Sequence, residues 1–197
     1  PVLSSGHLAY QTPLGTVPVA QAALEEIARN LSDQEVDFGF IRNDQEHALE
    51  IELPFLQVVL PQGFELIPLM QVSQRRNVVD ALSASILAYL NHAGPTKRTL
   101  LVASTDLSHF HHLNQAKELD KRFLGALEAM NTDQLYQLSQ TGQTEACGLG
   151  PVATILQVCQ ALGANHCQVL DYRTSADSSR DVHSVVGYAA AVITKTK

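Results

Sequence analysis

Apolar residues recur at helical spacing along most of the chain, and short polar segments separate these stretches. Val78, Val79, Leu82, Ile86 and Leu90 lie three or four positions apart, which is typical of the buried face of a helix. The same spacing, together with capping signals, predicts further helices. They are expected at about 18–30, from Leu119 to Met130, from Thr132 through Leu138, and from Pro151 to Gly163.

Continuous apolar runs between these helices predict strands. The run Thr99–Ser104 has the composition of a strand that is buried on both faces. Because strands alternate with helices of more than about ten residues, we expect an α/β sandwich with a largely parallel or mixed sheet, in one domain over residues 1–197. The other strands are expected at 64–70, 168–172 and 185–193.

Composition limits the class of protein. With 45% hydrophobic and 17% charged residues among 197, the chain is expected to fold around a core. Its net charge is −7 and its adjacent basic residues stand as separate pairs such as Arg75-Arg76 and Lys97-Arg98, so nucleic acid is not an expected partner. No apolar stretch approaches the roughly 20 residues of a membrane-spanning helix, and the first residues lack the features of a signal peptide. We therefore expect no membrane partner and a cytoplasmic location.

Three cysteines are too few, and odd in number, for a disulfide framework. Cys159 on an apolar helix face and Cys167 at a strand start are interpreted as core residues. Cys147 is bracketed by Gly148 and Gly150 just before a predicted helix, whose N-terminus favours a thiolate. Such a cysteine suits a soft metal ligand or a nucleophile. The alternative is a small buried residue at a turn.

A carboxylate and an imidazole follow the apolar run Thr99–Ser104, at a predicted strand end of the kind where ligands bind in open α/β sheets. Asp106 precedes His109 by three residues, so the carboxylate can orient the ring and stabilise its cation, whether the ring is a base or a metal ligand. Alternatively, Asp106 caps the helix that begins near Leu113 and the histidines are solvated. His111 and His112 are interpreted as rim residues.

A third polar segment covers residues 44–56. Glu46, His47, Glu50 and Glu52 stand close together and alternate with leucines that could anchor a helix face. His47 is then held towards a cleft, or the whole group is a solvated helix face, which the spacing alone favours. The zinc-protease motif H-E-x-x-H is absent because no second histidine follows at the required spacing.

Five segments occur together in the order of a known family. They are Thr12–Gly15, Glu46–Leu56, Ser104–Phe110, Ala146–Pro151 and Val185–Ala190. In this order they resemble the motifs of the MEMO family, whose prokaryotic members are called AmmeMemoRadiSam system protein B. The resemblance spans about residues 12–193.

The resemblance implies a LigB-like fold, similar to that of class III extradiol dioxygenases: a three-layer α/β/α sandwich with a non-haem metal site at one end of the sheet. The residues that match the family's pocket are His47, Asp106, His109 and Cys147, and Cys147 stands at the position of a metal-ligating thiol. The implied metal is iron or copper, which thiolate and imidazole donors suit. We expect Cys147 and His109 as ligands, His47 and His109 as acid/base or ligand groups, and Asp106 as the residue that orients His109.

The family pattern also includes an earlier segment with P-H-A-G-Y and G-P-S-H motifs, whose histidines complete the metal site. This sequence contains neither motif, and His7 does not fit them. Cys147 and His109 are two ligands where three are customary, so the metal is expected to bind weakly or to be absent. Without that segment a sheet edge or an apolar face is expected to be exposed, and a homodimer is one way to cover it.

Two classes of function stay open. One is a metal-dependent, dioxygenase-like oxidoreductase. The other is a non-catalytic binding or adaptor module that recognises a peptide or a small anionic ligand through the same histidines. Chelation or Cys147→Ala abolishes the first, whereas ligand binding survives chelation. A third hypothesis is a folded chain with no activity of its own. The name of the prokaryotic members also suggests a radical-SAM partner.

Overall fold

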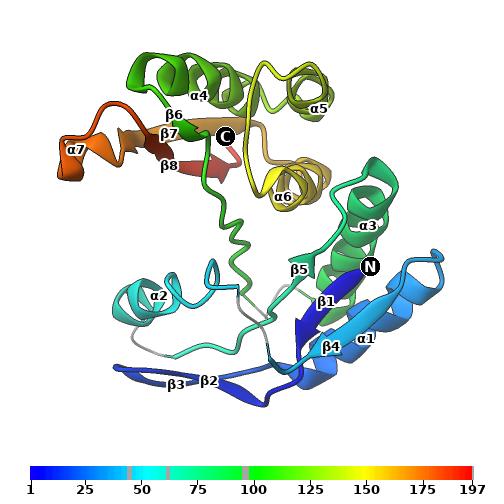
Figure 1. Ribbon diagram of the computed structural model, residues 1–197. Coiled ribbons are helices and arrows are strands. Elements are labelled where there is room, and N and C mark those ends of the chain that lie inside the picture. The colour runs from blue at the N-terminus through cyan, green and yellow to red at the C-terminus, as the bar shows by residue number, and fades with distance from the viewer. Residues whose placement is uncertain (44–45, 61–62, 95–97, 197) are drawn as a thin grey trace. The chain divides into compact units, whose positions relative to one another are not determined.

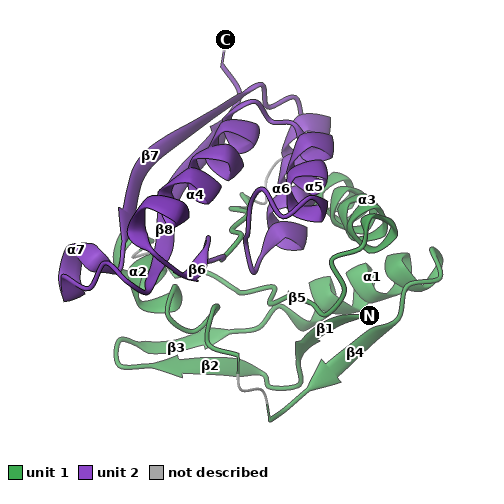
Figure 2. Ribbon diagram, turned by 45° about the horizontal axis from the view of Figure 1, so that its top comes forward, with its two compact units in different colours: residues 1–104 green, residues 105–197 purple. Residues whose placement is uncertain are grey.

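The structure is a computed structural model that describes residues 1–43, 46–60, 63–94 and 98–196 (Figure 1). The chain divides into two compact units, residues 1–104 (unit 1) and residues 105–197 (unit 2), each with its own buried residues (Figure 2). Asp44 of the third polar segment and Lys97 of the second basic pair lie outside the described residues. A single domain over residues 1–197 stays a prediction.

Unit 1 combines a small sheet, a hairpin and helices. Its elements are β1 (Val2–Ser5), β2 (Ala9–Thr12), β3 (Gly15–Pro18), α1 (Gln21–Ser32), β4 (Phe38–Ile41), α2 (Leu53–Val59), β5 (Met70–Gln71) and α3 (Arg76–Ala93). In the sheet, β1 lies between β4, to which it is parallel, and β5, to which it is antiparallel. β2 and β3 form the hairpin, and α1 packs against α3.

The helices of unit 1 form where apolar residues share a face. Leu24, Ile27 and Leu31 of α1 are buried at helical spacing, as are Val79 and Leu82 of α3. Both predicted helices are therefore confirmed, with ends that differ from the expected ones by a few residues.

Unit 2 contains a three-stranded antiparallel sheet with helices packed on it. Its elements are β6 (His109–His111), α4 (Leu113–Glu128), α5 (Thr132–Gln140), α6 (Leu149–Ala161), β7 (His166–Thr174), α7 (Ala176–Ser179) and β8 (Val185–Thr194). The strand order is β6-β8-β7. Figure 1 shows α4 along β7 and β8, which it contacts through a buried stripe that includes Leu119 and Phe123. This unit carries most of the candidate site.

Two of the four predicted strands do not form as expected. Within 64–70, Leu66 makes only an isolated bridge to Val19 and Met70 begins β5, so the run as a whole forms no strand. The segment Thr99–Ser104 forms no strand, and its Leu100 and Val102 side chains are 65% and 49% exposed. An apolar run forms a strand only where another strand pairs with its backbone, and a local pattern does not show whether such a strand exists. The strands predicted at 168–172 and 185–193 are confirmed as parts of β7 and β8.

One of the described sheets is mixed and the other two are antiparallel. Among the described strands, β1 and β4 are the parallel pair, and all other paired strands are antiparallel. A parallel bridge also joins Val19 to Leu66. The mixture of helices and strands confirms the α/β class. Of the two expected types of sheet, largely parallel or mixed, the sheet β4-β1-β5 is of the mixed type, whereas β7 and β8 are connected by a short segment and pair antiparallel.

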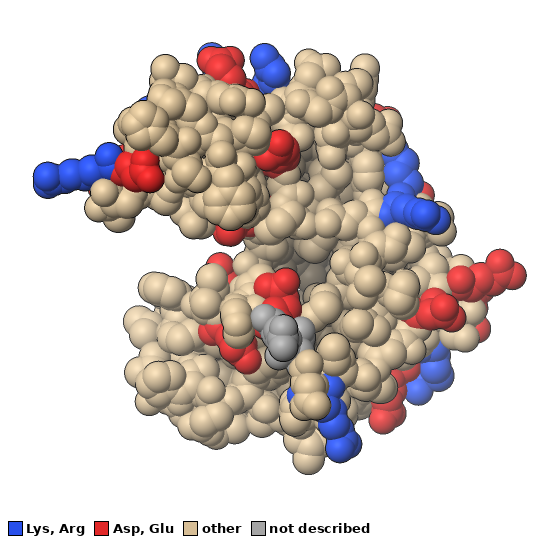
Figure 3. All heavy atoms as spheres, in the orientation of Figure 1, with Lys and Arg blue, Asp and Glu red and all other residues tan. Residues whose placement is uncertain are grey.

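The surface carries scattered charges. On the face drawn in Figure 3, Lys and Arg side chains stand apart from one another among neutral and acidic residues. None of the helices in the described ranges has the length and apolar character needed to cross a membrane.

Candidate functional site

The loop before α6 and the segment before β6 meet at Cys147. Its Sγ accepts a hydrogen bond from the backbone N–H of Asp106 at 3.1 Å, and Oγ1 of Thr105 lies 3.6 Å away. The N–H of Cys147 donates to the carbonyl oxygen of Asp106 at 3.2 Å. Oγ1 of Thr105 accepts from the N–H of Gly148 at 2.7 Å. The structure thus brings together two of the three segments singled out in the sequence.

These contacts suit a chemically active sulfur. Cys147 is exposed, and a backbone N–H points at its Sγ. A thiolate accepts such a bond more strongly than a thiol does, and the thiolate is the form that binds metals and attacks electrophiles. The alternative reading of Cys147 as a small buried residue at a turn is wrong.

The side chains of Asp106 and His109 form a pair. Nε2 of His109 lies 3.5 Å from Oδ2 of Asp106, and the two side chains are 31% and 44% exposed. Helix α4 is capped by His112, whose ring accepts a hydrogen bond from the N–H of Asn114. Asp106 is therefore not the cap of that helix. The carboxylate is placed to orient the imidazole ring.

Tyr188 on β8 belongs to the same surroundings. Partial burial and, second, the Asp106 carboxylate raise the pKa of Tyr188 above its ordinary value. The phenol therefore keeps its proton at neutral pH and can donate it in a hydrogen bond. In the sequence Tyr188 stands only as one letter of the last motif, and nothing local singles it out.

A second imidazole–carboxylate pair was missed by the sequence reasoning. Nε2 of His111 lies 3.0 Å from both carboxylate oxygens of Glu145. Glu145 stands two residues before Cys147 in the sequence. This closeness to a candidate site residue could have pointed to Glu145 as a further candidate. The exposed Phe110 lies between the two histidines in β6 with φ of 60°, where the register with β8 shifts.

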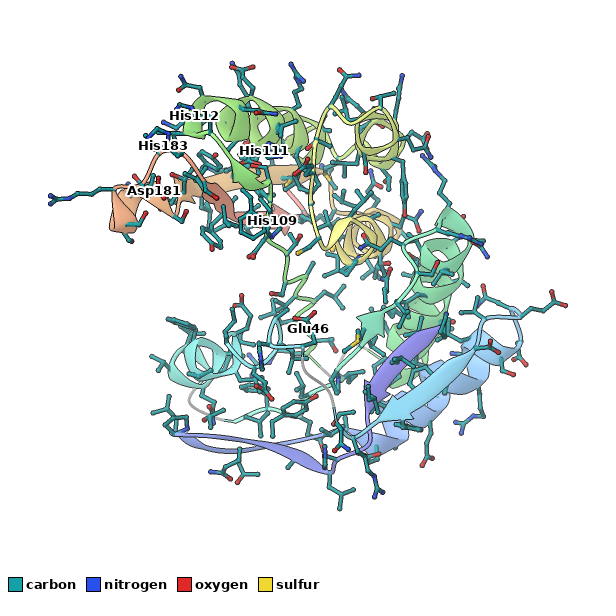
Figure 4. All side chains as sticks on the ribbon, in the orientation of Figure 1. Glu46, His109, His111, His112, Asp181 and His183 are labelled. Atoms are coloured by element: carbon teal, nitrogen blue, oxygen red, sulfur yellow. The ribbon has the colours of Figure 1, made fainter. Side chains whose placement is uncertain are left out.

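Two other histidines lie elsewhere in unit 2. The rings of His112 and His183 have centroids 5.7 Å apart, and Figure 4 shows them beside Asp181 near the start of α4. Asp181 accepts a hydrogen bond from the N–H of His183 at 2.8 Å. His109 is drawn at a different place, closer to the sheet (Figure 4). His112 is thus a helix cap.

His47 belongs to unit 1. Nδ1 of His47 lies 3.5 Å from Oε2 of Glu50, and both side chains are largely exposed. Oε1 of Glu46 accepts hydrogen bonds from the N–H groups of His47 and Ala48. These contacts agree with the solvated alternative, although the segment forms turns and the helix begins only at Leu53. The role that the resemblance implies for His47 stays a prediction.

The other two cysteines behave as core residues. Cys167 is buried and Cys159 is partly buried. Burial raises the pKa of both thiols, and Glu128 adds to the effect at Cys167. They are therefore natural controls for any chemistry at Cys147.

The donor types around Cys147 suit iron or copper, but their number is small. Sulfur and imidazole nitrogen are the ligands that these metals favour in proteins. In the described ranges no three His, Cys, Asp or Glu side chains lie close enough together to hold a metal ion. The described residues therefore fit part of a coordination sphere, since an open metal site uses three protein ligands.

Comparison with known proteins gives one consistent family. The sequence model of the Memo-like protein family matches residues 1–192. A MEMO1 family protein of Methanosarcina barkeri is 30% identical over 184 residues, which cover 93% of this chain and 67% of that protein. One from Nitrosopumilus maritimus is 30% identical, covering 92% and 64%. One from Thermotoga maritima is 34% identical, covering 93% and 63%. The chain thus spans about two thirds of the length of these relatives.

Proposed function

We propose, from the premise that this chain belongs to the Memo-like protein family, that unit 2 contributes part of the metal site of a non-haem iron or copper redox protein. Cys147 and His109 are the proposed ligands. The observation that carries the proposal is the bond from the N–H of Asp106 to Sγ of Cys147. If the protein is an enzyme, it is on this account an oxidoreductase of the dioxygenase-like type. The three-layer LigB-like sandwich is proposed on the same resemblance.

The local charge supports a cation over an anion. Two imidazoles of unit 2 stand beside carboxylates, His109 beside Asp106 and His111 beside Glu145. Each pair is neutral when its ring is protonated and negative when it is not, so neither pair attracts an anion. A thiolate adds further negative charge. The cluster therefore favours a metal cation over the small anionic ligand or anionic peptide of the alternative hypothesis.

The residues of the chain have defined tasks in this proposal. A bound iron or copper ion would supply one-electron redox chemistry. The Asp106 carboxylate favours the His109 tautomer that carries its proton on Nε2, which leaves Nδ1 with the lone pair. The N–H of Asp106 stabilises negative charge on Sγ of Cys147. Tyr188 keeps its phenol proton beside the same carboxylate.

Metal retention tests the proposal. The protein is loaded anaerobically with ferrous iron or cuprous copper and desalted, and metal per chain is measured by mass spectrometry. We expect the wild type to retain metal and Cys147→Ser to lose it. Cys159→Ser is the matched control and is expected to retain metal, because Cys159 lies in α6 away from the contacts around Cys147.

Two results would overturn the proposal: a wild type that retains no metal, or a Cys147→Ser variant that retains as much as the wild type. Binding of an anionic peptide by the chelator-treated protein, together with either result, would establish the binding-module alternative instead.

A further inference from the structure

We infer that Asp120 on α4 is a positioning residue that holds the Asp106–His109 turn against Cys147. The hydrogen bonds of Asp120 go to Ser108, one residue before His109, and to Tyr172. That Asp120 matters for metal binding rests on the proposed function, whereas its effect on the position of the turn does not. The inference stands on three sets of contacts that meet at one place in unit 2.

The Asp120 carboxylate is fully buried and has two donors. Oδ1 accepts from the backbone N–H of Ser108 at 2.9 Å, and Oδ2 accepts from the phenol of Tyr172 at 2.7 Å. Burial and this bond raise the pKa of Tyr172 well above its ordinary value, so the phenol stays a donor. Both donors are neutral, and a buried carboxylate that lost either one would carry an uncompensated cost.

Gly187 on β8 makes this approach possible. Its carbonyl oxygen accepts from the N–H of Leu107 at 2.9 Å, and its N–H donates to the carbonyl oxygen of Ser108 at 3.0 Å. A Cβ at position 187 would overlap the Asp120 carboxylate. The turn is therefore held on one side by α4, through Asp120, and on the other by the backbone of β8.

The same turn of α4 also anchors the loop that carries Cys147. The hydroxyl of Thr144, which is buried, donates to the carbonyl oxygen of Leu119 at 3.1 Å. Leu119 and Asp120 thus fix both segments that meet at the site. The bond between Asp106 and Cys147 depends on the relative position of these segments, so Asp120 sets it without touching the sulfur.

The test uses the metal-free protein and two readouts of that bond. One is the NMR chemical shift of the Asp106 amide proton. The other is the rate at which iodoacetamide alkylates Cys147 at a fixed pH, followed by mass spectrometry. Neither readout follows from global stability, which is measured separately by urea denaturation.

Asp120→Leu keeps the branched shape of the side chain and removes both acceptors. We expect the Asp106 amide signal to move to the position of a weaker hydrogen bond and the alkylation rate to change by at least about twofold, because the turn then no longer holds its N–H on the sulfur. Asp120→Asn is the matched rescue. Its carbonyl oxygen can accept from Ser108 and its amide can donate to the Tyr172 oxygen, so both readouts are expected to stay near wild type.

Tyr172→Phe keeps the test decisive if Asp120→Leu does not fold. It removes one donor and keeps the ring, so we expect the same changes at about half the size. A folded Asp120→Leu, or a Tyr172→Phe protein, with the wild-type amide signal and alkylation rate would overturn the inference and leave Asp120 with a purely structural role. Because no metal is used, this result is independent of whether the protein retains iron or copper.

Discussion

Two histidine–carboxylate pairs in this protein have the same spacing and the same length but different surroundings. His47 and Glu50 in unit 1, and Asp106 and His109 in unit 2, are each three residues apart in sequence and 3.5 Å apart in space. In the first pair the side chains are 74% and 58% exposed, against 31% and 44% for His109 and Asp106.

The difference between the pairs lies in what holds them. The backbone around His47 is bonded to its own neighbour, Glu46. The turn that carries His109 is bonded to α4 through Asp120, to β8 through Gly187 and to the Cys147 loop. Short sequence spacings between a carboxylate and a histidine are common in proteins. A turn that three separate segments hold in place, by contrast, preorganises the side chains that it carries. The second pair is thus held by more of the fold than the first.

The largest expected effect comes from filling the space at Gly187. Gly187→Ala forces the Asp120 carboxylate away from its donors, so we expect the free energy of unfolding to fall by about 3 kcal/mol. Gly125→Ala on the same helix as Asp120 is the matched control. Nothing lies within 4 Å of a Cβ there, so it is expected to stabilise by about 0.5 kcal/mol. Urea denaturation followed by circular dichroism measures both, and equal stabilities would contradict the role given to Gly187.

A smaller effect is expected at Tyr172, and it depends on pH. Burial and the bond to Asp120 raise its pKa, whereas the unfolded chain gives up a phenol proton near pH 10. The unfolded state then binds fewer protons than the folded state, so the free energy of unfolding falls as the pH rises above about 10. Tyr172→Phe should cost about 1 kcal/mol at pH 8 and show a flatter alkaline decline. A variant that declines as steeply as the wild type would show that Tyr172 is not the group responsible.

The smallest effect distinguishes the two pairs directly. Glu50→Gln and Asp106→Asn are each expected to change stability by less than about 0.5 kcal/mol, because both carboxylates are substantially exposed. Their effects on the neighbouring ring should differ. Asp106→Asn is expected to shift the tautomer ratio of His109 away from the form with its proton on Nε2, while Glu50→Gln leaves that of His47 nearly unchanged. Nitrogen NMR of the imidazole rings measures both ratios, and equal responses would remove the distinction between the pairs.

The helices were predictable because a buried stripe is a local property. Leu24, Ile27 and Leu31 reveal α1 without any knowledge of what covers them. The absence of a strand at Thr99–Ser104 was not predictable, since strand formation depends on a partner strand elsewhere in the chain.

The site shows the same division. Asp106, His109 and Cys147 were found from local chemistry and from the resemblance. Asp120 and Glu145 were missed because their contacts join residues 12, 34 and 52 positions apart. One signal for Asp120 was present: it is a charged residue within the buried stripe of α4, and such residues are rarely buried without a partner.

A thiolate-to-metal charge-transfer band would show whether the sulfur of Cys147 binds the metal, as proposed. Cobalt(II) added anaerobically serves as a spectroscopic stand-in for ferrous iron. We expect this absorption band in the wild type, in Cys159→Ser and in His47→Ala, and its loss in Cys147→Ser. A wild type without the band, or a Cys147→Ser protein that keeps it, would rule out Cys147 as the sulfur ligand.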